Sequence, residues 1–283
     1  MKRLCLFVMT LALCTYSFHQ MDRMRQAQAL PPKLLLLPSR EMTRVMSFGN
    51  EILAAQLIFY NSMFFVGSLE KPPTPAMSRN LYYTLDTVTY LDPYNGDGYY
   101  FAQGMLSWNR SLIEPLNTLL RRGMTYRSWD WHIPFYYGFN QFYFLGKSKK
   151  AAKYFKRAYE LNPQNTFLPT LIARLYYEAE ETQVAIGFLE EMIRNTTSEK
   201  LRKWMMVRLE ALRLVSLLEH AVNRYQQRYN SKPHNLRMLV EGGMIKAIPP
   251  DPYGGKFYLD QSGRVRTTSQ FVYVREKSSG SGQ

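Results

Sequence analysis

The side chains that most often catalyse reactions or bind metals are few in this sequence and far apart. No His-x3-His pair or His/Asp/Glu cluster occurs at the spacing of metal ligands. Both cysteines fall in the first apolar segment, so no thiol site can form in the body of the chain. The sequence therefore predicts no metal site. The residues considered are His19, His132, His220, His234, Cys5 and Cys14.

Paired carboxylates are the next candidates for chemistry. Glu180-Glu181 and Glu190-Glu191 are adjacent residues within helical patterns, so the members of each pair point in different directions and are typical of a solvated helix surface. The sequence also contains no G-x-S-x-G elbow, Walker loop or G-x-G-x-x-G. We therefore expect no enzyme, no cofactor and no small-molecule substrate, and look for a binding surface.

The composition is that of a folded, basic protein. The 283 residues are 46% hydrophobic and 14% aromatic, which suits one extended solenoid or two compact domains. The net charge of +14 fits three kinds of partner: an acidic protein surface, anionic lipid or nucleic acid. Nucleic acid ranks third, because the chain has no short Lys/Arg run, zinc spacing or nucleic-acid motif.

The first residues resemble a membrane-targeting segment. MKRLCLFVMTLALCTYSF places two basic residues before about fifteen apolar or small ones. We predict an uncleaved signal anchor over residues 1–20, in an inner membrane with the chain facing the periplasm, followed by a proline-rich linker over 21–40. Three alternatives stay open: a signal peptide cleaved at Ala27–Ala29, a lipid on Cys14, or a buried helix of a cytoplasmic protein.

One stretch of 34 residues, His132 to Asn165, has small and large residues at helical-hairpin spacing. Small residues let the two helices approach, aromatic residues fill the space beside that contact, and a late proline ends the second helix. The stretch resembles a tetratricopeptide repeat (TPR), whose period is about 34 residues. The residues that carry the resemblance are Gly138, Phe139, Phe142, Ala151, Phe155, Ala158 and Pro163.

Similar but degenerate patterns occupy residues 41–199. We expect a long buried helix over 41–68, a helix over 76–91, and two further repeats beginning near Gly98 and Thr166. In the first of these repeats, Gly104 corresponds to Gly138, and the second helix covers Ile113 to Tyr126. Residues 200–230 contain neither proline nor glycine and predict one or two long helices that close a solenoid of about four repeats.

The tail, residues 231–275, changes from helix to turn chemistry. Phe257–Leu259 and Val265–Thr267 predict two short strands joined by the turn Asp260–Gly263. The tail resembles the carboxy-terminal half of the major pseudopilin of type II secretion, but it lacks that family's acidic calcium loop. We expect residues 276–283 to be disordered. The matching positions are Pro233, Leu236, Leu239, Pro249, Asp251, Pro252, Tyr253, Gly254 and Tyr258.

The predicted fold class is therefore mainly α: a TPR-like helical-hairpin solenoid with a small C-terminal β-hairpin.

The TPR resemblance implies a concave groove lined by fixed positions of each first helix. Asn140 and Arg174 are the strongest candidates, because packing alone does not call for a polar group there, whereas tyrosines also pack between helices. The predicted partner-binding residues are Tyr99, Asn109, Tyr136, Asn140, Tyr143, Arg174 and Tyr177.

Charge adds a second candidate surface. Residues 200–283 hold 15 of the Lys/Arg and 6 of the Asp/Glu residues. A helix face in this region could lie against anionic headgroups or an acidic partner, or could simply be solvated. Its basic residues are Lys200, Arg202, Lys203, Arg208 and Arg213.

As a whole the chain is similar to bacterial envelope proteins with a short anchor, loose TPRs and a pseudopilin-like end. This resemblance implies a non-enzymatic scaffold that binds protein partners, in a pilus-like, secretion or transport assembly. The alternative is a soluble TPR regulator or a nucleic-acid-associated basic adaptor. The tail either docks into a fibre or caps the solenoid.

Overall fold

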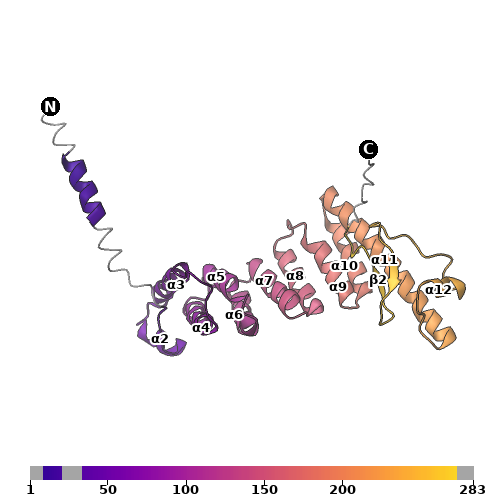
Figure 1. The fold of residues 1–283 in the computed structure, drawn as a ribbon, viewed down its shortest axis with the longest axis horizontal. Coiled ribbons are helices and arrows are strands. Elements are labelled where there is room, and N and C mark those ends of the chain that lie inside the picture. Colours follow the sequence, from indigo (N-terminus) through magenta and orange to yellow (C-terminus); the bar gives the residue numbers. More distant parts are fainter. Residues whose placement is uncertain (1–8, 21–33, 273–283) are drawn as a thin grey trace, which may run out of the picture. The chain divides into compact units, whose positions relative to one another are not determined.

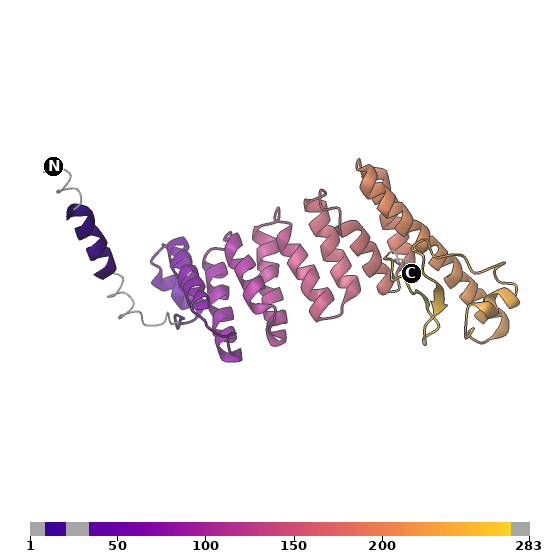
Figure 2. The ribbon, with the colours of Figure 1, turned by 45° about the horizontal axis from the view of Figure 1, so that its top comes forward.

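The computed structural model describes residues 9–20 and 34–272, and these residues are mainly helical. Residues 9–20 form one helix. The rest separates between Tyr126 and Arg127 into two compact units, each described here by itself. Within each unit, helices that follow one another in the sequence pack side by side (Figures 1 and 2). The predicted mainly α fold with a small C-terminal sheet is confirmed.

Several predictions concern residues outside these ranges. The signal anchor includes residues 1–8, the linker includes 21–33, and the predicted disordered end is 276–283. Within the described ranges, no helix combines the length and the hydropathy needed to cross a bilayer.

The N-terminal unit is a series of helices separated by proline- or asparagine-containing turns. The Thr74 side chain accepts a hydrogen bond from the Met77 amide and so caps α4, and Asn95 caps α5 in the same way through the Gly98 amide. The predicted helix Ile113–Tyr126 has those same bounds. The helices are α2 (Arg40–Met46), α3 (Glu51–Gly67), α4 (Pro75–Leu91), α5 (Gly96–Leu106), the 3-10 helix η1 (Arg110–Leu112) and α6 (Ile113–Tyr126).

The prediction of one long buried helix over residues 41–68 is wrong. Phe48 and Gly49 have φ angles of +48° and +85°, so the chain leaves the right-handed helical region and α2 and α3 are separate helices. Glycine takes such an angle without strain, which is why the break falls there. α3 is also not buried on all sides, as described below.

A charged cluster ties three helices of the N-terminal unit together. The Asp86 carboxylate on α4 pairs with Arg40 of α2 at 2.9 Å and with Arg122 of α6 at 2.8 Å. Arg122 also donates to the Thr89 hydroxyl at 2.9 Å. The two guanidinium groups neutralise one mostly buried carboxylate, as burial of a charge requires.

The C-terminal unit repeats the same pattern and then ends in one 31-residue helix, α11, and the tail. Part of α7's continuation is a π-helix, η2, in which the backbone turn is wider than in an α-helix. The elements are α7 (His132–Phe139), η2 (Asn140–Phe144), α8 (Ser148–Leu161), α9 (Leu168–Glu178), α10 (Thr182–Asn195), α11 (Glu199–Tyr229), α12 (Arg237–Glu241), β1 (Phe257–Leu259) and β2 (Val265–Thr267).

Gly138 of α7 packs closely against Ala151 and Phe155 of α8. A Cβ atom on this residue would lie 3.1 Å from the Phe155 ring and 3.3 Å from the Ala151 carbonyl, which is tighter than ordinary van der Waals contact. The predicted role of Gly138 is therefore confirmed. A Cβ atom on Gly104, its predicted counterpart, would have no neighbour within 4 Å. The predicted equivalence of Gly104 and Gly138 is therefore wrong.

The predicted hairpin is confirmed to the residue. β1 and β2 pair antiparallel, with Tyr258 opposite Arg266. In the turn, the Asp260 carboxylate accepts hydrogen bonds from the Ser262 hydroxyl at 2.6 Å, from the Arg264 amide at 3.0 Å and from Arg266 at 3.0 Å. These donors, the Ser262 hydroxyl above all, hold the pKa of Asp260 far below its usual range.

Candidate functional site

The C-terminal tail folds back onto α9 and α11 and adds four large side chains to the core of its unit. One face of the hairpin is buried, while Tyr258 and Arg266 lie on the opposite face. Burial of this size, rather than the few strand hydrogen bonds, holds a two-stranded hairpin in place. The buried tail side chains are Tyr253, Phe257, Val265 and Phe271.

Arg208 of α11 fastens the tail. Its Nε atom donates to the Tyr253 hydroxyl at 3.1 Å, and its Nη2 atom donates to the Phe271 carbonyl at 2.9 Å. The guanidinium also lies 5.2 Å and 4.6 Å from the centres of the two rings. Burial lowers the pKa of Arg208. The prediction that Arg208 belongs to an exposed basic face is therefore wrong, because only 8% of the residue is exposed.

The Asp251–Gly255 turn is fixed by the Asp251 carboxylate. It accepts hydrogen bonds from the hydroxyls of Thr267 and Ser269 and, at 2.9 Å, from the Tyr253 amide. A Cβ atom on Gly255 would lie 2.6 Å from this carboxylate, so the turn closes only around glycine. The Asp251 carboxylate thus connects the turn to Thr267 of β2 and to Ser269 just after it.

Tyr177 joins α9 to the hairpin. Its hydroxyl donates to the Val265 carbonyl at 2.8 Å, and its ring meets the Phe271 ring edge-on with centres 4.9 Å apart. Arg264 donates to the carbonyls of Tyr177 and Glu178 at the end of the same helix. Burial raises the pKa of the Tyr177 hydroxyl, and the nearby arginines oppose that shift. This tyrosine therefore binds its own chain.

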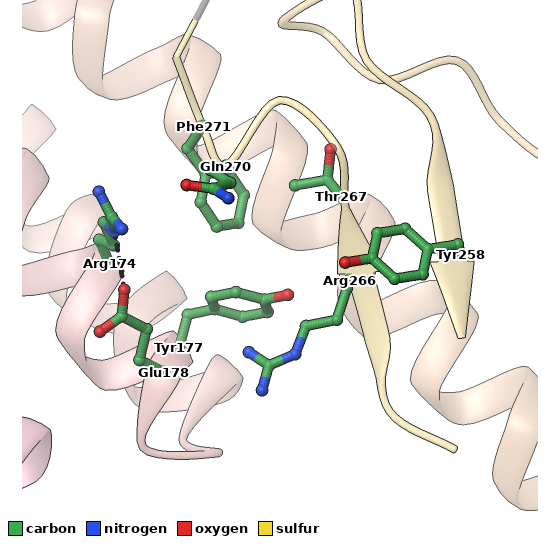
Figure 3. A pocket seen from close by; sticks show the side chains of 8 residues that line it. All are labelled: Arg174, Tyr177, Glu178, Tyr258, Arg266, Thr267, Gln270 and Phe271. Carbon is green, nitrogen blue, oxygen red and sulfur yellow. Dashed lines mark hydrogen bonds and ion pairs between the residues drawn. The ribbon is translucent and has the colours of Figure 1, made fainter. Parts of the chain in front are cut away.

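Beside Tyr177 lies a cavity of about 390 Å³ between α9 and the tail. Arg174 reaches toward it from α9 and forms an ion pair with Glu178 at 2.8 Å, while Arg266 extends under the Tyr177 ring from β2 (Figure 3). The other lining residues are Tyr258, Thr267, Gln270 and Phe271.

The lining suits an anionic group beside an aromatic one. Arg174 and Arg266 supply guanidinium donors, and each already has one carboxylate partner, Glu178 and Asp260 respectively. The exposed fraction of the Arg174 side chain is 37%, so a ligand from solvent can reach it. Through these guanidinium groups the cavity can bind a carboxylate.

The predicted groove residues of the C-terminal unit have different environments. Arg174 and Tyr177 lie together at the cavity. Tyr143 is 62% exposed, and Tyr136 is half-buried, which raises the pKa of its hydroxyl. Asn140 is fully buried, so the prediction that it lines an open groove is wrong. Asn140 is the first residue of η2, and it packs in the interior of its unit.

The two predicted groove residues of the N-terminal unit have structural roles. Tyr99 is fully buried and donates to the Pro93 carbonyl at 3.0 Å, which corrects its placement on a surface. The Asn109 side chain caps η1 by accepting from the Ser111 amide at 3.2 Å.

The tail's contribution to the cavity was missed from sequence. Tyr177 and Val265 lie 88 residues apart, and helical periodicity carries no information about such a contact. One signal was available: the alternation in Phe257–Leu259 and Val265–Thr267 places Tyr258 and Arg266 on one face of the predicted hairpin.

In the described ranges, no three His, Cys, Asp or Glu side chains come close enough to hold a metal ion. No protein-family model matches the chain, and no curated protein is similar enough to be counted as a relative.

Proposed function

We propose that this protein is a non-enzymatic, membrane-anchored scaffold of TPR-like helical pairs in the bacterial envelope. The periodicity of the helices supports the repeat assignment. The first helices of three successive pairs begin 36 residues apart, at Gly96, His132 and Leu168. Their partners begin at Ile113, Ser148 and Thr182. A repeat near 34–36 residues, with the close α7–α8 contact at Gly138, is typical of TPR hairpins.

The observation that carries a binding role is the cavity at α9. It is formed at the predicted groove positions of the last helical pair, and it offers an accessible guanidinium, Arg174, with exposed Tyr258 on the opposite side (Figure 3). A partner protein would insert an acidic side chain or its terminal carboxylate there. Recognition would rest on shape and charge, with no bond made or broken.

The tail's contacts favour the role of a cap over insertion into a fibre. The face of the hairpin that carries Phe257 and Val265 is already buried against its own unit. Solenoids need a terminal element that covers the last repeat, and Tyr253 and Phe271 supply that cover through Arg208.

A reporter that is active only outside the cytoplasm, fused after Gln283, tests the location. Activity in the membrane fraction is the expected result. Activity in the soluble exported fraction would mean that the first segment is cleaved. An inactive reporter with the protein in the cytosol would contradict the envelope assignment and favour a soluble regulator or nucleic-acid-associated adaptor.

Quantitative affinity capture from solubilised envelopes tests the binding site. Arg174→Gln removes one charge-assisted hydrogen-bond donor, so recovery of envelope partners should fall by about tenfold. Arg157→Gln is the matched control, because Arg157 is an exposed arginine on α8 outside the cavity. Equal recovery with both variants would contradict the cavity as the partner site.

A further inference from the structure

Helix α3 has two apolar faces, and only one of them is covered. Its buried face packs against α4 and contains Ala55, Ile58, Phe59, Ser62 and Phe65. The opposite face is exposed to solvent, and none of its exposed residues is charged. The exposed large side chains, with exposed fractions from 42% to 68%, are Ile52, Leu53, Leu57, Tyr60, Met63 and Phe64.

Further large apolar side chains are exposed in the residues that precede α3. In the described ranges, the two most exposed large apolar side chains are Phe48 at 88% and Leu36 at 87%, and both belong to this region. Phe48 lies in the α2–α3 turn and has a φ angle of +48°, which is unfavourable for a bulky residue. Leu35, Met42, Val45 and Met46 are exposed as well, and the charged residues Glu41 and Arg44 are exposed among them.

A surface of this kind is costly in water. Each square ångström of apolar area removed from water stabilises a protein by about 25 cal/mol, and monomeric proteins seldom leave large contiguous apolar patches uncovered. The end helix of a soluble repeat stack normally presents a polar outer face. The α2–α3 surface, as we call these residues from 35 to 64, therefore calls for an occupant.

We infer that the α2–α3 surface lies on the hydrocarbon boundary of a lipid bilayer, an inference that rests on the proposed membrane anchor. The chain length supports this placement. From residue 20 to residue 34 the connecting chain spans at most about 50 Å. An inserted N-terminal segment would hold this surface within that distance of the membrane, at a high effective concentration.

The chemistry of the surface favours lipid over a second copy or a partner helix. Specific protein interfaces carry roughly one hydrogen bond per 100–200 Å², which fixes orientation and register. Among the exposed large side chains of α3, only Tyr60 can form one. A fluid apolar phase needs no such pairing, and tyrosine is suited to the boundary between acyl chains and water. The exposed residues of α3 are uncharged, and Glu41 and Arg44, the exposed charged residues of the α2–α3 surface, have opposite signs. Docking should therefore depend little on lipid charge and on salt.

The test uses the full chain in vesicles that contain a phospholipid with a diazirine in its acyl chain. Illumination attaches the lipid to side chains that touch hydrocarbon, and mass spectrometry locates the adducts. We expect adducts in residues 1–20 and also in residues 35–64, with equal yield in phosphatidylcholine and in mixed phosphatidylglycerol vesicles. The exposed residues of α11 should carry few.

A double variant, Leu57→Asp with Phe64→Asp, should lower the adduct yield on residues 35–64 by about tenfold or more, since two apolar contacts are replaced by charges. Labelling of residues 1–20 should not change. The matched control is Met206→Asp with Leu217→Asp, which places the same charges on exposed apolar positions of α11.

The outcomes separate this inference from the proposed function. Adducts confined to residues 1–20 would overturn the docking inference and leave the anchor intact. Crosslinks between two copies through position 57, with no lipid adducts on α3, would assign the surface to a contact between copies. That result would also overturn the docking inference. Protein that stays in the soluble fraction without any adduct would overturn the anchor and, with it, the docking inference.

Discussion

The apolar side chains of α11 in the C-terminal unit and of α3 in the N-terminal unit are covered to different extents. The chain covers α11 with its own tail, where Arg208, Tyr253 and Phe271 are all buried. On α3 the residues from Ile52 to Phe64 leave one apolar face in solvent. Both helices need a cover for apolar surface. Within the described residues, the tail covers α11, whereas no described residue covers the exposed face of α3.

The largest expected effect separates the two faces of α3. Phe59→Ala should destabilise the N-terminal unit by about 3–5 kcal/mol, because the ring is buried and meets Phe101 edge-on. Phe64→Ala should change stability by less than about 0.5 kcal/mol, because that ring is already exposed. Hydrogen exchange in α3 and α4 measures both. Equal losses would mean that the two faces are covered alike.

Replacing Arg208, which bonds to the tail, should have the next largest effect on stability. Arg208→Met keeps the aliphatic stem but loses both hydrogen bonds and the cation–π contacts, at a cost of about 2–4 kcal/mol. Amide exchange in residues 250–272 should accelerate. Lys203→Met, at an exposed position of the same helix, should leave exchange unchanged. A tail that stays protected in Arg208→Met would show that the tail does not depend on this residue.

Tyr177→Phe tests a single bond between α9 and the hairpin. The change leaves the Val265 carbonyl without its donor, and should cost about 1 kcal/mol, seen as faster exchange around β2. Tyr258→Phe is the matched control on the outer face of the hairpin and should have no measurable effect. If the two variants behave alike, the Tyr177 hydroxyl does not hold the tail.

The smallest effect concerns Glu219 of α11, whose carboxyl accepts from the Thr182 hydroxyl at 3.2 Å. Burial raises the pKa of Glu219, so the folded state favours the protonated form. The corresponding stability is present below the ordinary glutamate pKa of about 4.3 and is lost as the pH rises through the folded-state pKa. Glu219→Gln should therefore raise the Tm at neutral pH and have little effect in acid. A lower Tm at neutral pH would contradict this assignment.

Local signals predicted local structure well. The bounds of α6 follow from helical periodicity, and those of both strands follow from turn residues and alternation, all of which act over a few positions. The break at Phe48–Gly49 and the π-helix at Asn140 were not predicted, because both lie inside stretches whose apolar spacing continues as in an α-helix. The groove position predicted for Asn140 is wrong because the residue is buried, while Arg174 lies at a cavity that the tail helps to form.

The cavity itself needed the structure, because half of it comes from the tail. Gln270 and Phe271 have φ angles of +49° and +60°, and no feature of their sequence indicates that the chain turns there toward α9. The exposure of one face of α3 could not be predicted from the sequence for a different reason. Its two faces are equally apolar, so the pattern predicts burial on all sides.

The measurement that tests the comparison most directly is oxidative footprinting of the full chain in vesicles, with hydroxyl radicals generated in the water. Met46 and Met63 near α3 and Met206 on α11 have similar exposed fractions of 58%, 42% and 54%. The account predicts that Met206 is oxidised, that Met46 and Met63 are protected by lipid, and that Tyr253 and Phe271 are protected by the tail's own packing. Rapid oxidation of Met63, or of Phe271, would contradict it.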